Sequence, residues 1–156
     1  MLDVPLMFSC LPLNMRAEIY QASCRARLAL PLFLWRVPAG FPSPADDYLE
    51  GELDLNDLLI ENPAATFYVR LAGDSMIKAG LLDGDILVVD RSLKARHRHI
   101  VVAVLDGEMT VKRLYASGGR VELRPENPAY QPIVIAEGRE LLIWGVVIGS
   151  VRRLAR

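Results

Sequence analysis

From residue 66 onward, short apolar runs alternate with turn-forming residues along the chain. Runs of this length, rich in β-branched and aromatic residues, are typical of strands. They predict strands at residues 66–72, 86–90, 100–105, 109–115, 120–124, 133–136 and 141–151. The turn signals between them are Asp83-Gly84, Asp106-Gly107, Ser117-Gly118-Gly119, Glu126-Asn127-Pro128 and Glu137-Gly138. Many short strands with closely spaced turns predict a mainly β fold, a compact antiparallel β domain.

One short helix is predicted just before these strands, at residues 53–60. Asp54 is a suitable N-cap because its carboxylate can accept a backbone N–H of the first turn. Asn62 and Pro63 follow the apolar positions, and proline cannot continue a helix. The helix is therefore expected to end before residue 62.

Residues 1–38 follow neither the strand pattern nor the helix pattern. They contain four prolines, at positions 5, 12, 31 and 38, and their apolar residues have no regular spacing. Residues 15–29 are as compatible with a helix as with irregular structure. We therefore expect this part of the chain to be an extended, flexible N-terminal arm rather than a domain.

Residues 37–44, with the sequence VPAGFPSP, hold three prolines and one glycine. Such a segment resists helix and sheet and favours extended, exposed backbone. Composition alone is typical of a linker. A second interpretation is a substrate segment for a protease, because proteases bind extended chain at exposed loops. The small residues Ala39 and Gly40 would then fit a narrow specificity pocket.

The overall composition narrows the function classes. With 156 residues the chain is most simply one domain plus a tail, long enough to bury a core. Its formal net charge of −1 gives no electrostatic argument for binding nucleic acid or an anionic membrane. We therefore expect no direct sequence-specific DNA binding and no membrane association.

Cysteines and apolar runs indicate a cytoplasmic protein without cofactors. Cys10 and Cys24 form no metal-ligand spacing, and reduced thiols are expected. The apolar run at residues 28–35 is shorter than the about 20 residues that a membrane span needs. Residues 1–12 lack the basic start of a signal peptide. The only histidines, His97 and His99, have no third ligand nearby, so no metal site is expected.

The candidate chemistry lies in Gly73-Asp74-Ser75-Met76 and, 37 residues beyond the serine, Lys112. Ser75 follows a predicted strand beside a glycine, a place where a hydroxyl is well presented. A serine hydroxyl is a weak nucleophile until a base takes its proton. Lysine can be that base only when burial lowers its pKa, and arginine cannot replace it. Because the chain has only three lysines, one on an apolar strand invites the hypothesis of a Ser75/Lys112 dyad.

Simpler interpretations of both residues stay open at this point. Ser75 alone is most often a helix cap, here for a turn at residues 76–79. Lys112 alone is most often an exposed strand residue, although it shares a strand face with Thr110 and Leu114. A nucleophile elbow is excluded because position 77 is isoleucine. A Ser/His/Asp triad would need a histidine from the basic run at residues 96–99, which is typical of a solvated turn.

Residues 37–153 resemble the UmuD/MucA group of LexA-like self-cleaving serine peptidases (peptidase S24). The motifs that carry the resemblance are AGFPSPA at 39–45, GDSM at 73–76, DGD at 83–85, VD at 89–90, TVK at 110–112 and WGVV at 144–147. Each is weak alone, but together they occur in the expected order. One departure is Arg98, which stands where many relatives have glycine.

The resemblance implies a function and a set of site residues. Ser75 would be the nucleophile, Lys112 the general base, and Ala39-Gly40 the scissile bond. Residues 1–39 would be an arm removed by self-cleavage, and residues 40–156 the LexA-like β peptidase domain. The implied partners are a RecA–single-stranded DNA filament that stimulates cleavage in the SOS response, a second copy in a homodimer, and a UmuC-like translesion DNA polymerase.

Three alternatives are weighed against this interpretation. A LexA-type repressor needs an N-terminal helix-turn-helix domain, which proline-rich residues 1–38 do not suit. A signal peptidase also joins a Ser-Met pair to a lysine, but it requires a membrane anchor. A non-catalytic β-rich module that regulates a polymerase would tolerate alanine at Ser75 and at Lys112.

Overall fold

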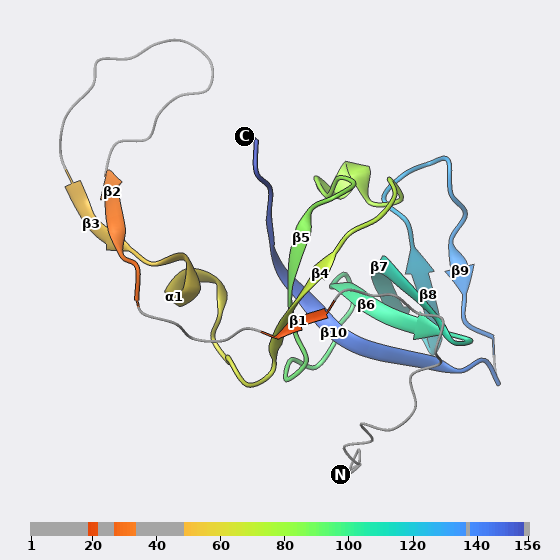
Figure 1. Cartoon of the computed structure of the whole chain (residues 1–156). Helices are drawn as coiled ribbons and strands as arrows, with labels where there is room; N and C mark the ends of the chain where they lie inside the picture. Colours follow the sequence, from red (N-terminus) through yellow and green to blue (C-terminus); the bar gives the residue numbers. More distant parts are fainter. Residues whose placement is uncertain (1–18, 22–26, 34–48, 137, 155–156) are drawn as a thin grey trace.

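The computed structural model describes residues 19–21, 27–33, 49–136 and 138–154. Within them, eight strands form one sheet in the order β1-β4-β5-β10-β6-β7-β8-β9, and every neighbouring pair is antiparallel (Figure 1). Its strands are β1 (Ile19–Gln21), β4 (Thr66–Arg70), β5 (Ile86–Asp90), β6 (Ile100–Leu105), β7 (Glu108–Ser117), β8 (Arg120–Arg124), β9 (Ile133–Val134) and β10 (Leu141–Val151). The predicted mainly β, antiparallel fold is confirmed.

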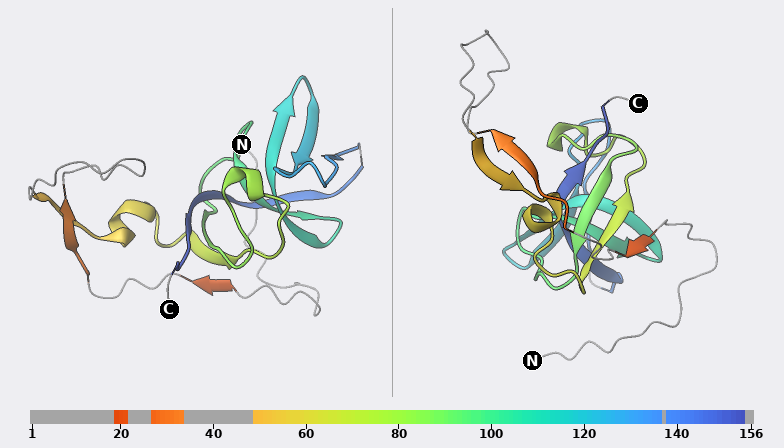
Figure 2. Two further views of the ribbon diagram at one scale, coloured as in Figure 1. Left: turned by 90° about the horizontal axis from the view of Figure 1, so that it is seen from above. Right: turned by 60° about the vertical axis from the view of Figure 1, so that its left-hand side comes forward.

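A separate two-stranded sheet pairs β2 (Leu30–Phe33) with β3 (Leu49–Leu53). It stands away from the large sheet in every view (Figure 2). A hydrogen bond links the residues before β2 to the helix that follows β3. The Leu28 N–H donates to Oδ2 of Asp54, the N-cap of that helix, at 2.7 Å. Residues 34–48 connect the two strands and lie outside the described residues, so the predicted cleavage segment is not placed.

The long strand β10 crosses the middle of the large sheet and pairs with both β5 and β6. Its register shifts twice, between Ile143 and Gly145 and between Val147 and Gly149. Such bulges bend a strand and increase its twist. Gly145 is required at the first bend, because a Cβ there would lie 2.6 Å from Val89 Cγ1 and 3.0 Å from the Asp90 carbonyl oxygen.

The curved sheet buries both faces of its central strands. Adjacent residues of β5 and β6 are fully buried although they point to opposite faces, as Val88 and Val89 show. One core cluster gathers around Phe67, Met76 and Val102, and a second consists of Val101, Ala103, Leu114 and Leu123. Strands buried on both faces explain why the sequence shows continuous apolar runs at these positions.

The strand bounds predicted from sequence are correct for β5, β6, β8 and β10. β4 and β9 end two residues earlier than predicted, and β7 is longer at both ends. The helix α1 (Leu55–Leu59) is shorter than residues 53–60, because Leu53 belongs to β3. Its N-cap is Asp54, as predicted, and the Asn56 N–H donates to Asp54 Oδ1 at 2.8 Å.

The N-terminal part differs from the sequence analysis in two ways. A helix around residues 15–29 is wrong at residues 19–21, which form β1 and pair with β4 from Ile19↔Val69 to Gln21↔Phe67. Strands β2 and β3 were not predicted at all. β2 contains Pro31, which is tolerated because this strand pairs only with β3 and is therefore an edge strand.

Candidate active site

Ser75 lies on the irregular turn that follows β4. The turn begins at Gly73, whose φ of 86° is easily reached only by glycine and whose N–H donates to Asp83 Oδ1 at 2.7 Å. Met76 is 1% exposed and packs into the core cluster around Phe67. The short helix η1 (Ile77–Ala79) then leads away. Ser75 is therefore fixed between a glycine turn and a core anchor, with its side chain half-buried.

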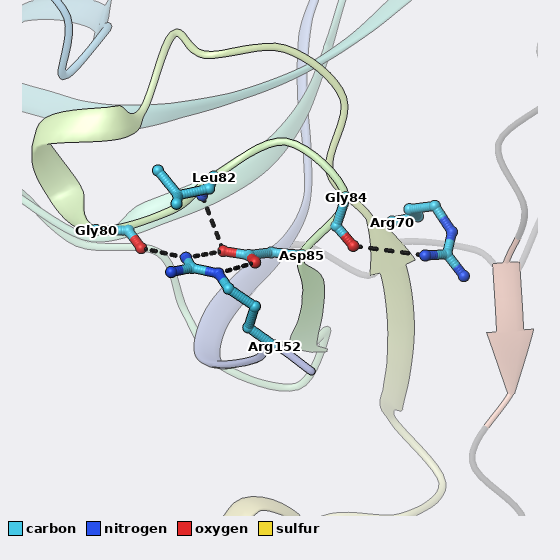
Figure 3. Close-up of polar contacts among 6 residues, drawn as sticks. All are labelled: Arg70, Gly80, Leu82, Gly84, Asp85 and Arg152. Atoms are coloured by element: carbon cyan, nitrogen blue, oxygen red, sulfur yellow. Dashed lines mark hydrogen bonds and ion pairs between the residues drawn. The ribbon is translucent and has the colours of Figure 1, made fainter. Parts of the chain in front are cut away.

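The loop after η1 contains a buried carboxylate, Asp85, that is bonded to Arg152 near the other end of the chain (Figure 3). Asp85 is 1% exposed, accepts from Arg152 Nε at 2.6 Å and accepts the Leu82 N–H at 2.8 Å. Arg152 also donates to the Gly80 carbonyl oxygen at 2.8 Å. The Arg152 guanidinium, together with the Leu82 N–H, lowers the pKa of Asp85 below its usual value of 3.8. Together with the Gly80 contact, this ion pair fixes the loop between η1 and β5.

Lys112 comes from β7, where it pairs in register with Val101 of β6. Its residue is only 9% exposed, which is unusual for lysine. The Nζ atom lies 2.9 Å from Ser75 Oγ, 2.9 Å from Thr110 Oγ1 and 3.0 Å from the Val111 carbonyl oxygen. The structure thus brings together the serine and the lysine that the sequence singled out.

The surroundings of Lys112 disfavour its charged form. Burial lowers the pKa of its amine below the ordinary 10.5. In the described residues all three hydrogen-bond partners of Nζ are neutral, and no carboxylate forms an ion pair with it. No opposing charge therefore offsets the effect of burial.

The three contacts suit a neutral amine, which has two N–H groups and one lone pair. Thr110 Oγ1 and the Val111 carbonyl oxygen can accept the two N–H groups. The lone pair then faces the Ser75 hydroxyl, which can donate its proton to it. The arrangement can therefore activate the serine oxygen. Thr110 was placed on the same strand face from the sequence but was given no role there.

Two backbone N–H groups beside the hydroxyl remain available. Across the described ranges, neither the Ser75 N–H nor the Met76 N–H donates to a backbone acceptor, whereas the Ile77 N–H donates to the Asp74 carbonyl oxygen. Free N–H groups at this place can stabilise negative charge on the oxygen of an attacked carbonyl group.

The simpler interpretations of the two residues are wrong. The N-cap of η1 is Met76 and no side chain caps it, so Ser75 is not a helix cap. Lys112 is buried rather than exposed. The histidines are engaged elsewhere: His97 Nδ1 accepts the Ala116 N–H at 3.2 Å, and His99 Nδ1 accepts the Arg96 N–H at 3.3 Å.

Three further expectations concern the scissile bond, a metal site and a membrane span. Ala39 and Gly40 lie outside the described residues. Among residues that are described, no cluster of three or more His, Cys, Asp or Glu side chains is arranged to hold a metal ion. No helix within the described ranges is both long and apolar enough to cross a membrane.

The class of site is one in which a lysine amine can activate a serine hydroxyl on an antiparallel β fold. A family model described as Peptidase S24-like matches residues 31–148. The chain belongs to this family, and the resemblance to its UmuD/MucA group, predicted from the motifs, is confirmed.

Curated relatives agree with this assignment. The chain is 54% identical to protein SamA of Salmonella typhimurium over 123 residues, which cover 79% of this chain and 85% of SamA. It is 55% identical to protein ImpA of Escherichia coli over 129 residues, covering 79% and 83%. It is 42% identical to protein MucA of Escherichia coli over 139 residues, covering 88% and 94%.

Proposed function

We propose that this protein is a self-cleaving serine endopeptidase in which Ser75 is the nucleophile and Lys112 the general base. The observation that carries the proposal is the 2.9 Å approach of a buried lysine amine to the serine hydroxyl. Membership in the Peptidase S24-like family supports it. The substrate is the chain's own Ala39-Gly40 bond, inferred from the AGFPSPA segment.

In the first step, Ser75 Oγ attacks the Ala39 carbonyl carbon while its proton passes to neutral Lys112 Nζ. The N–H groups of Ser75 and Met76 stabilise the negative charge that develops on the carbonyl oxygen. The Lys112 ammonium then returns a proton to the Gly40 nitrogen as the peptide bond breaks. This leaves an ester between Ala39 and Ser75.

In the second step, water attacks the ester carbonyl carbon and gives its proton to Lys112. The ester bond breaks, and the proton returns to Ser75 Oγ. The products are residues 1–39 and residues 40–156. Because one chain carries one scissile bond, each molecule is cut once.

The biological setting follows from the resemblance. A RecA–single-stranded DNA filament formed after DNA damage would stimulate cleavage by binding preferentially to the conformation with a docked cleavage segment. The processed homodimer would serve as accessory subunit of a UmuC-like error-prone polymerase. All of this is expected to take place in the cytoplasm, with no cofactor.

The test is to incubate the purified protein between about pH 7 and 10, with and without the filament, and to follow its intact mass. Wild-type protein should yield a fragment that begins at Gly40, and the rate should rise with pH as Lys112 loses its proton. Ser75→Ala and Lys112→Ala should abolish it. A chain that stays intact under every condition would overturn the peptidase proposal and favour a non-catalytic binding module.

A further inference from the structure

Residues 126–130, which follow β8, lie against the turn that carries Ser75. The Glu126 N–H donates to the Ser75 carbonyl oxygen at 2.8 Å, and the Lys78 N–H donates to the Glu126 carbonyl oxygen at 2.8 Å. The sequence predicted only a chain reversal at Glu126-Asn127-Pro128. We call residues 126–130 the bracing segment, because its backbone is bonded on both sides of Met76.

Side chains of the bracing segment hold the residue just before the serine. Asn127 Nδ2 donates to the Asp74 carbonyl oxygen at 3.1 Å and to Asp74 Oδ2 at 3.3 Å. The Tyr130 hydroxyl donates to Asp74 Oδ1 at 2.5 Å. The segment keeps its own shape, because the Ala129 N–H donates to Asn127 Oδ1 at 3.0 Å. Asp74 is thus held at its backbone and at both carboxylate oxygens.

The bracing segment is also bonded to the strand that carries the lysine. Arg113, the neighbour of Lys112 on β7, donates from Nε to Glu126 Oε1. Arg113 donates in addition to the Arg98 carbonyl oxygen at 2.8 Å. Glu126 therefore contacts the serine turn through its backbone and the lysine strand through its side chain.

Such a brace matters because Ser75 lies on an irregular turn, not within a regular element. The reacting oxygen must stay within hydrogen-bond distance of Lys112 Nζ, and small displacements of reacting groups slow reactions greatly. Lys112 is fixed by its strand ladder. The position of Ser75 depends instead on contacts made to its turn.

We propose that Asn127 and Tyr130 are positioning residues, which hold the Asp74–Met76 turn so that Ser75 Oγ faces Lys112 Nζ. The inference rests on the proposed function of this pair. Neither residue touches the reacting atoms; both act through Asp74. The distinction from a purely structural role is that their loss slows cleavage while the fold persists.

Tyr130 and Asp74 lie at the surface, so the loss of their hydrogen bond should affect the position of Ser75 more than the stability of the fold. Tyr130 is 45% exposed and Asp74 is exposed, so the hydroxyl of Tyr130 is dispensable for the core. The hydrogen bond that Tyr130 donates to the Asp74 carboxylate raises the pKa of Tyr130 above its usual 10.0, and the negative charge of that carboxylate adds to the effect. Tyr130 therefore stays protonated, and remains a hydrogen-bond donor, to higher pH than an ordinary tyrosine.

The experiment compares Tyr130→Phe with Tyr68→Phe, in which the same oxygen is removed from a tyrosine whose hydroxyl bonds to nothing in the described part of the chain. Self-cleavage is followed by intact mass from pH 7 to 10, and the melting temperature is measured. We expect Tyr130→Phe to be about 3- to 10-fold slower at every pH, since the variant loses one hydrogen bond that holds the serine turn. The midpoint of the pH profile and the melting temperature should match wild type, and Tyr68→Phe should behave as wild type.

A charge exchange gives a second, independent readout. Asn127→Asp places a carboxylate against Asp74 and should slow cleavage more than Tyr130→Phe does. The double variant Asp74→Asn/Asn127→Asp restores a donor–acceptor pair and should recover part of the lost rate. Wild-type rates in both Tyr130→Phe and Asn127→Asp would overturn the inference, as would a rate loss that follows a lowered melting temperature.

Failure of the brace is distinguishable from failure of the proposed function. If wild type cleaves and Ser75→Ala does not, the self-cleavage rates of Tyr130→Phe and Asn127→Asp test the positioning role. If wild type never cleaves, the peptidase proposal fails and amide hydrogen exchange at residues 74–79 still tests the brace. Faster exchange there in Tyr130→Phe and Asn127→Asp supports it, and unchanged exchange overturns it.

Discussion

At the scale of single residues, the amine of Lys112 has neutral partners on all sides. Its position next to Ser75 depends on two acceptors from its own strand, Thr110 Oγ1 and the Val111 carbonyl oxygen. When these acceptors take the two N–H groups of the neutral amine, its lone pair is directed at Ser75 Oγ. Burial then favours the form of the amine that can accept a proton.

Replacing Thr110 by valine keeps the shape of the side chain but removes an acceptor from Lys112. We expect self-cleavage to become about tenfold slower, because one N–H of the buried amine loses its partner and the lone pair is no longer directed at Ser75. The measurement is the cleavage rate at fixed pH. Thr66→Val is the matched control, since buried Thr66 bonds to the Asn62 carbonyl oxygen away from the site. Equal rates in the two variants would contradict a directing role for Thr110.

At the scale of elements, the close approach of β10 to β5 depends on the absence of a side chain at Gly145. Gly145→Ala should lower the free energy of unfolding by about 1–3 kcal/mol, because the new methyl group meets Val89 and the backbone of Asp90. Urea unfolding measures the loss. In the control Gly149→Ala, the new methyl group meets chiefly the flexible end of Leu59 at 3.0 Å, so the loss should be smaller. Similar losses in both variants would contradict the packing argument.

The Asp85–Arg152 pair makes a contribution to stability that depends on pH. Because the pKa of Asp85 is lowered from 3.8, its contribution is complete above that value and declines as pH falls through the lower pKa of the folded state. Asp85→Asn should therefore be less stable than wild type at pH 7, with a smaller further loss on acidification to about pH 3. Urea midpoints at the two pH values measure this. If acidification lowered the urea midpoint of wild type and of Asp85→Asn equally, the ionisation of Asp85 would not contribute to stability.

The sheet was predictable from local pattern, and the site only in part. Apolar runs between glycine and proline turns located most strands because burial and turn chemistry act locally. Nothing local marked the contact between Asp74 and Asn127, which lie 53 residues apart. The alternation of side chains along the strand predicted which residues share a face with Lys112. It could not predict that Lys112 is buried, because burial depends on the parts of the chain that cover this face. β1, β2 and β3 escaped prediction because they are short and lie outside the regular alternation of apolar runs and turns.

At the scale of the whole molecule, the proposed cleavage would remove two strands. β1 covers one edge of β4, and β2 is the partner of β3. Both lie within residues 1–39, so the 40–156 product should lose protection from amide exchange in β3 and β4. Exchange measured by mass spectrometry on peptides from residues 49–53 and 66–70, before and after cleavage, tests this. Unchanged exchange in both peptides would contradict the placement of these strands.

The most direct test is a titration of the Lys112 amine by NMR in Ser75→Ala protein, which stays uncut. The chain has only three lysines, so selective labelling gives three signals, and exposed Lys78 and Lys94 provide the comparison. Lys112 should lose its proton below the ordinary lysine value of 10.5, and its midpoint should be close to that of the wild-type cleavage rate. A Lys112 signal that titrates together with the other two would contradict a neutral lysine acting as the base for Ser75.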